Sequence, residues 1–222
     1  MFPLRDSLRS ETMPLVTVAL ILANLLAFFY ELTLDDYTLH YFLSHWGTVP
    51  SHFQFLDIFT SMFLHGGWMH VLGNMWFLWI FGDNIEDILG HGQYLVFYLL
   101  CGVAGGLLHV YFNPESSVPA IGASGAISGV MGAYLVSFPH ARVHTLVIFI
   151  FFITTIDVPA FLMIGYWFVV QLFSGVGQLA NASANGGGTA WFAHVGGFLA
   201  GVILIRLMPT RRRSALRLED RW

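Results

Sequence analysis

Four polar side chains in apolar, glycine-rich segments have the types needed for acyl transfer. Ser124 stands in Gly-Ala-Ser-Gly, where a loop turns into an apolar helix, and His194 stands in Ala-His-Val-Gly-Gly. A serine nucleophile needs a base, and neutral imidazole titrates near pH 7. His70 and Asn74 are four residues apart, hence on one helical face, and both can donate to an oxyanion. The set predicts Ser124 as nucleophile, His194 as base, and His70 and Asn74 as oxyanion donors.

No carboxylate is placed to orient His194. Asp157, which interrupts the apolar run before the fifth span, is expected on the opposite side of the membrane from Ser124. We therefore expect a Ser–His dyad rather than a triad. The unpaired amides at the start of the Ser124 helix would add to the oxyanion hole. The ten histidines do not predict a metal site, since no intramembrane carboxylate or His-x-x-His pair completes one.

The composition indicates a membrane protein. Of 222 residues, 56% are hydrophobic and 10% are charged, with a mean hydropathy of +0.69, whereas soluble domains carry about 25% charged residues. The apolar runs are continuous rather than alternating, which favours helices over a barrel. We expect an all-α polytopic membrane protein forming a single domain over residues 1–222, with no separate soluble domain. No basic, aromatic-laced patch predicts nucleic-acid binding, and the single Cys101 excludes an internal disulfide.

Six segments approach the roughly 20 residues needed to cross a bilayer. They are residues 13–34, 68–81, 93–112, 124–138, 158–173 and 189–208. The first is too long, and lacks the small-residue pattern, for a cleavable signal peptide. These segments predict a six-helix bundle.

Two connecting segments have their own apolar patterns. Between the first two spans, the long outer loop 35–67 carries apolar residues at helical spacing, which predicts an interfacial amphipathic helix. The run 146–155 is about ten residues long, the length of a re-entrant or interfacial piece.

Charge predicts the orientation. The nine basic residues are all arginine, and six spans with a cytoplasmic N-terminus put every one on the cytoplasmic side. Both termini would then be cytoplasmic, and a bacterial cytoplasmic membrane is the expected location. The short helix after Ser124 leaves that residue below the outer surface, so the sequence implies a wet cavity open to the outside.

Glycines would let the reacting helices meet. Ser124 and His194 must come within about 3 Å of each other. The patterns Gly125-x-x-x-Gly129 and Gly197-x-x-x-Gly201 permit a close helix crossing. We therefore expect the fourth and sixth helices to pack against each other along these glycines.

Five motifs, in order along nearly the whole chain, resemble the rhomboid intramembrane serine proteases. They are Thr60-Ser61-Met62-Phe63-Leu64-His65-Gly66-Gly67, His70-x-x-x-Asn74, Gly122-Ala123-Ser124-Gly125, Gly165-Tyr166-Trp167-Phe168-x-x-Gln171 and Ala193-His194-Val195-Gly196-Gly197. The resemblance implies a six-helix bundle that cleaves transmembrane helices of other proteins near the outer face, with the roles given above. It implies no cofactor, transmembrane protein substrates and lipid as partners, and substrate entry past the fifth helix beneath a cap at residues 186–188.

Two positions depart from this resemblance. Some members carry an aromatic residue four positions after the nucleophile, where this chain has Ser128. Some carry Trp-Arg where this chain has Leu56-Asp57. The departures leave open how His194 is held and how the first loop is anchored.

Two other classes of function compete with the protease. A catalytically inactive relative that binds membrane helices would lack Ser124 or His194, and both are present. A transporter would show pseudo-symmetric halves and mid-membrane ionisable residues, and no convincing repeat is visible. The sequence predicts neither the substrate nor the oligomeric state.

Overall fold

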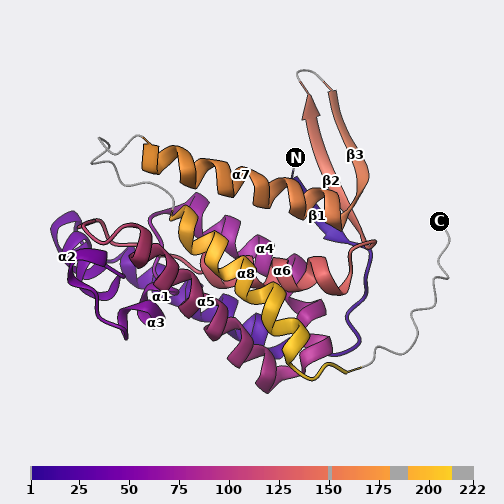
Figure 1. Ribbon diagram of the computed structural model, residues 1–222, viewed down its shortest axis with the longest axis horizontal. Helices are drawn as coiled ribbons and strands as arrows, with labels where there is room; N and C mark the ends of the chain where they lie inside the picture. The colour runs from indigo at the N-terminus through magenta and orange to yellow at the C-terminus, as the bar shows by residue number, and fades with distance from the viewer. Residues whose placement is uncertain (1, 150–151, 181–189, 212–222) are drawn as a thin grey trace.

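The computed structural model describes residues 2–149, 152–180 and 190–211, and it is mostly helical (Figure 1). In chain order its elements are β1 (Phe2–Asp6), α1 (Leu15–Glu31), α2 (Asp36–Trp46), the 3₁₀ helix η1 (Pro50–His52), α3 (Asp57–Ser61), α4 (Trp68–Leu89), α5 (His91–Phe112), α6 (Ser124–Ser137), β2 (Arg142–Phe149), β3 (Phe152–Pro159), α7 (Ala160–Ala180) and α8 (Trp191–Leu207). Helices occupy all six segments predicted as spans. The predicted cap at 186–188 and the arginines beyond residue 211 lie outside the described residues.

Helix α4 continues beyond the predicted span 68–81, because its acidic residues are bonded within the fold. Glu86, 1% exposed, accepts hydrogen bonds from the backbone N–H groups of Val16 and Thr17 at 2.8 Å each. It thereby caps the first turn of α1, whose amides have no partner within their own helix. Gly90, with a φ of 76°, ends α4.

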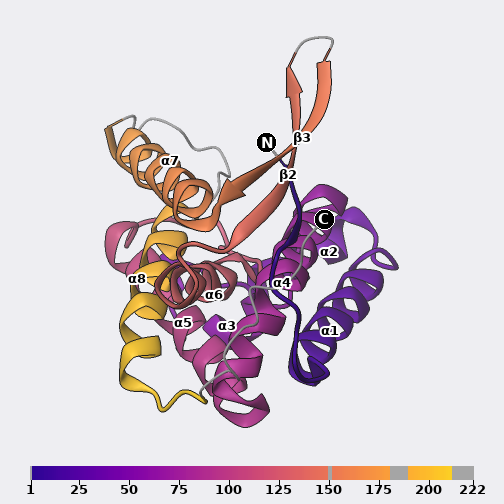
Figure 2. The ribbon, with the colours of Figure 1, turned by 90° about the vertical axis from the view of Figure 1, so that its right-hand side faces the viewer.

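A three-stranded antiparallel sheet, ordered β1-β2-β3, corrects the all-helical prediction. The run 146–155, predicted as a re-entrant or interfacial piece, forms most of the β2–β3 hairpin, with Phe149 paired to Phe152. This segment is rich in β-branched and aromatic residues, which favour strands. The hairpin extends beyond the helices (Figure 2).

The loop between α1 and α4 is partly helical. It contains α2, η1 and α3, and α3 includes Ile58 and Phe59 of the apolar pattern noted above. Ile58 is 1% exposed and belongs to the main hydrophobic core. That residue therefore packs inward against the bundle and does not lie on a free surface.

Within the described chain, α5 is the helix that is both long and apolar enough to cross a membrane by length and composition alone. The other apolar helices are shorter by the same measure: α1, α6, α8 and the part of α7 from Ala160 to Phe173.

Helices α6 and α8 lie side by side (Figure 1). A β-carbon on Gly197 would overlap the carbonyl oxygen of Gly125, and one on Gly201 would overlap the carbonyl oxygen of Gly129. Only hydrogen at these positions allows the two backbones to touch. The glycines predicted to form a close crossing do meet in the structure.

We expect Gly201→Ala to lower the thermal unfolding midpoint in detergent, because the methyl group must push α8 away from α6; overpacking of this kind costs on the order of 1–3 kcal/mol. The matched control is Gly165→Ala on α7, where a β-carbon meets nothing within 4 Å. That variant should be neutral or slightly stabilising, since alanine favours a helix over glycine. Equal midpoints for the two variants would contradict the close crossing.

Candidate active site

Ser124 is the first residue of α6, directly after a turn that only glycine fits. Gly122 has a φ of 118°, in the left-handed region that favours glycine. A β-carbon there would also lie 2.6 Å from Nε2 of His70. The N–H of Gly122 donates to the carbonyl oxygen of Ser61 at 2.8 Å, which ties the turn to the end of α3. Ser124 is therefore presented by a tightly constrained loop.

The hydroxyl of Ser124 and the imidazole of His194 are hydrogen-bonded, with Oγ 2.7 Å from Nε2. His194 lies in the first turn of α8 and is 7% exposed. The residues are 70 positions apart in sequence, and the glycine-mediated approach of α6 to α8 brings them together. This is the distance that proton transfer from a serine to a base requires.

Helix α7 supplies two further contacts to His194. The side-chain oxygen Oε1 of Gln171 lies 2.7 Å from Nδ1 of the imidazole. The Trp167 ring contacts the imidazole ring, with centroids 5.9 Å apart and planes tilted by 37°. Trp191 meets the same ring edge-on at 6.1 Å. These contacts show how His194 is held here without an aromatic residue at position 128.

Sequence reasoning assigned no role to Gln171, although the residue falls within a motif shared with the rhomboids. A usable signal was present, because a polar side chain in an apolar span is costly and usually functional. Ser128, by contrast, is bonded back to its own helix, with its hydroxyl donating to the carbonyl oxygen of Ser124 at 2.6 Å.

All four predicted site residues line one cavity of about 320 Å³, together with Trp167, Gln171 and Trp191. His70 accepts a hydrogen bond from the N–H of Gly66 through Nδ1 at 3.4 Å. Its neutral form therefore carries the proton on Nε2. Asn74 is 8% exposed and follows one turn later on α4. Both side chains can donate a hydrogen bond inside this cavity.

Asn74 is held by a neutral histidine. Burial lowers the pKa of His65 to about 4, so this side chain is uncharged at pH 7. Its Nδ1 lies 3.3 Å from the carbonyl oxygen of Phe63, which can only accept, so Nδ1 carries the proton. Nε2 is then the acceptor for the amide of Asn74 at 3.0 Å. One N–H of the Asn74 amide is thus fixed, which orients the rest of the group.

A buried carboxylate anchors this histidine in turn. Glu31, at the end of α1, is 2% exposed, and its oxygens accept from the backbone N–H of His65 at 3.1 and 3.3 Å. The chain of contacts from Glu31 through His65 to Asn74 links the first helix to the predicted oxyanion donors. It fixes the segment between α3 and α4.

Ser124 also lines a second, smaller cavity. Its volume is about 30 Å³, enough for one water molecule. Thr48, Ser61 and His109 contribute polar atoms to its lining. Among the described residues, no group of three or more His, Cys, Asp or Glu side chains is arranged to hold a metal ion.

Comparison with known proteins gives consistent matches. A family model of the Rhomboid domain matches residues 52–211. Rhomboid protein 1, mitochondrial, of Saccharomyces cerevisiae is 29% identical over 175 residues, which cover 75% of this chain and 47% of that protein. Rhomboid-like protein 11, chloroplastic, of Arabidopsis thaliana is 28% identical over 172 residues, covering 72% and 53% respectively.

A bacterial relative matches over a shorter stretch. Rhomboid protease GluP of Bacillus subtilis is 38% identical over 78 residues, which cover 35% of this chain and 15% of that protein. The chain thus spans about half, or less, of the length of these relatives. Since the family model covers well over half of the chain, the predicted resemblance is confirmed: the chain belongs to the rhomboid family of membrane proteins.

Proposed function

We propose that this protein is an intramembrane serine endopeptidase, with Ser124 as nucleophile and His194 as general base and acid. The observation that carries the proposal is the 2.7 Å contact between Oγ of Ser124 and Nε2 of His194 in a cavity also lined by His70 and Asn74. One relative is named a rhomboid protease, which supports the same chemistry.

The proposed reaction is acyl transfer in two steps. Oγ of Ser124 attacks the carbonyl carbon of a peptide bond while its proton passes to Nε2 of His194. The oxyanion is bound by Asn74, by Nε2–H of His70 and by the N–H of Ser124. His194 then protonates the leaving amine, the C–N bond breaks, and an acyl-enzyme remains. Water, deprotonated by His194, hydrolyses that ester and restores Ser124.

We further propose that α1, α4, α5, α6, α7 and α8 are six membrane crossings within one domain. Large apolar side chains exposed on the outer faces of three of these helices support this: Leu22 and Leu26 on α1, Leu95 and Leu100 on α5, Leu199 and Ile203 on α8. With its 14 residues, α6 is about 21 Å long, shorter than the roughly 30 Å hydrocarbon layer. Ser124 would therefore lie below one membrane surface, within reach of a transmembrane helix but accessible to water.

The distribution of arginine supports a cytoplasmic location for both termini. Arg5 belongs to β1, Arg142 begins β2, and Arg206 lies in the last turn of α8. Figure 1 shows β1, the start of β2 and the end of α8 at the end of the molecule away from α2. With the basic end inside, the substrate would be cut near the outer face. The relatives named above include mitochondrial, chloroplastic and bacterial proteins, so the bacterial membrane stays a prediction.

We expect Ser124→Ala to abolish both cleavage of a transmembrane substrate and labelling by a fluorophosphonate. The hydroxyl supplies the covalent bond, and its loss removes little packing, so the unfolding midpoint should stay near that of the wild type. The control is Ser128→Ala, whose hydroxyl is bonded to its own helix; this variant should still label. An unlabelled wild type that also cuts no helix would favour the inactive, helix-binding alternative.

We expect Asn74→Ala to lower kcat by about 10²–10³-fold with little change in KM, the loss seen when one oxyanion donor is removed. Steady-state kinetics on a transmembrane substrate would measure this. The unfolding midpoint of the variant should be recorded in parallel, because the change also removes the partner of His65. A normal kcat with a lowered midpoint would make Asn74 a purely structural residue.

A further inference from the structure

We propose that Gln171, on α7, is a positioning residue that orients the imidazole of the base His194. Ser124, His194 and Gln171 then act as a neutral triad. The inference rests on the proposed function and goes beyond it by assigning a third partner. The dyad predicted above had no group to orient His194. The structure has such a group, on a helix that carries neither reacting residue.

The atoms of this contact select one tautomer of His194. Gln171 presents Oε1, which can only accept, to Nδ1 of the imidazole at 2.7 Å. Nδ1 must therefore carry the proton of the neutral ring. Nε2 is left with a free lone pair, directed at the Ser124 hydroxyl at 2.7 Å. In the other tautomer Nε2 would be a donor and could not take the serine proton. Gln171 thus holds the ring in the form that can act as a base.

The position of Gln171 is itself fixed by packing. The side chain is 8% exposed, so it has little room to swing away. Trp167 lies four residues earlier, on the same face of α7, and its ring contacts the imidazole ring. Phe168 stacks on Phe198 of α8 with centroids 4.2 Å apart and planes at 23°, which docks α7 beside His194. The alignment of the base therefore depends on where α7 lies.

A neutral amide suits this place better than a carboxylate would. An ionised group at membrane depth is costly when nothing pairs with it. In the resting site His194 is neutral, so a carboxylate at position 171 would lack an opposite charge. The amide oxygen accepts the same hydrogen bond without that cost. It orients the ring but adds no full charge to stabilise the imidazolium.

The test uses the full chain in detergent and measures the second-order rate constant of Ser124 labelling by a fluorophosphonate across pH. This probe needs no identified substrate. Gln171→Leu removes the acceptor and should slow labelling by about tenfold to 10²-fold, part of the 10²–10⁴-fold that a positioned base contributes. Its unfolding midpoint should stay close to that of the wild type.

Gln171→Glu distinguishes an orienting role from a merely structural one, because a structural role would leave the pH dependence of the labelling rate unchanged. The carboxylate can accept from Nδ1, so labelling should be largely restored at high pH. It also stabilises the protonated ring, so the acid limb of the pH–rate profile should shift to higher pH. The other titratable groups that act on His194 in the described chain are His70 on α4 and His109 on α5. Both are unchanged in the variant, so residue 171 would be the cause of a shift.

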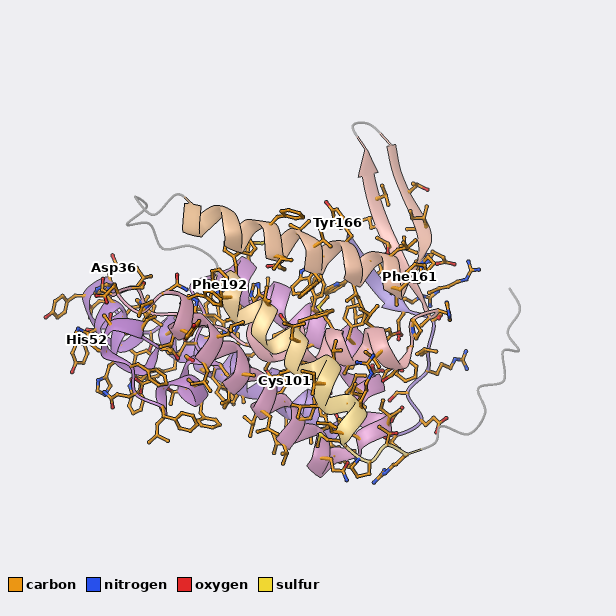
Figure 3. All side chains as sticks on the ribbon, in the orientation of Figure 1. Asp36, His52, Cys101, Phe161, Tyr166 and Phe192 are labelled. Carbon is orange, nitrogen blue, oxygen red and sulfur yellow. The ribbon has the colours of Figure 1, made fainter. Side chains whose placement is uncertain are left out.

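The matched control on α7 is Tyr166→Leu. Tyr166 is 69% exposed and points away from the bundle (Figure 3), so this variant should label like the wild type. Suppose that the wild type labels. If Gln171→Leu then labels as fast as the wild type, or if the acid limb of the Gln171→Glu profile does not move, the role of Gln171 is wrong and the proposed function still stands. A wild type whose Ser124 does not label at all would instead overturn the proposed function.

Discussion

The candidate site depends on backbone contact between α6 and α8. Side chains at Gly197 or Gly201 would meet a carbonyl group of α6, so the two helices can touch only through glycine. That contact sets His194 one hydrogen bond away from Ser124. Helix association in a membrane gains little from hydrophobic burial and relies on packing. The same glycines therefore serve both the stability of the bundle and the geometry of the proposed reaction.

Polar groups inside the bundle are bonded in ways that join distant parts of the chain. Glu86 on α4 caps the amides at the start of α1, and Glu31 at the end of α1 holds the backbone of His65. An unsatisfied polar group in an apolar surrounding costs several kcal/mol. Each of these carboxylates is thus a strong constraint on how the helices fit together. Through His65, one of them reaches Asn74.

The proposed catalytic groups come from α4, α6 and α8, and two of them are oriented by neighbours that take no part in bond breaking. His65 orients Asn74, while Gln171 and Trp167 orient His194. The side chains that contact Asn74 and His194 are neutral. The Glu31 carboxylate contacts neither residue directly and instead bonds the backbone of His65. Such a site can be built at membrane depth without leaving an ion exposed to lipid. The orientation of His194 therefore depends on the position of α7 as well as on that of α8.

The sequence alone predicted the family, the helical segments and the four polar residues that line the cavity, because local features carry that information. Apolar runs mark helices, glycine spacing marks a close crossing, and a serine or histidine in an apolar span marks a site. It did not predict the β2–β3 hairpin, since a ten-residue apolar run fits several structures and only pairing with β1 and β3 selects a strand. The predicted second span ended at residue 81, short of Glu86, because the partners of Glu86 at the start of α1 are about 70 positions away. For Gln171 the sequence signalled a polar residue in an apolar span, but it did not show the partner of that residue. Its partner lies 23 residues away on another helix, and only tertiary packing decides which side chain faces Nδ1.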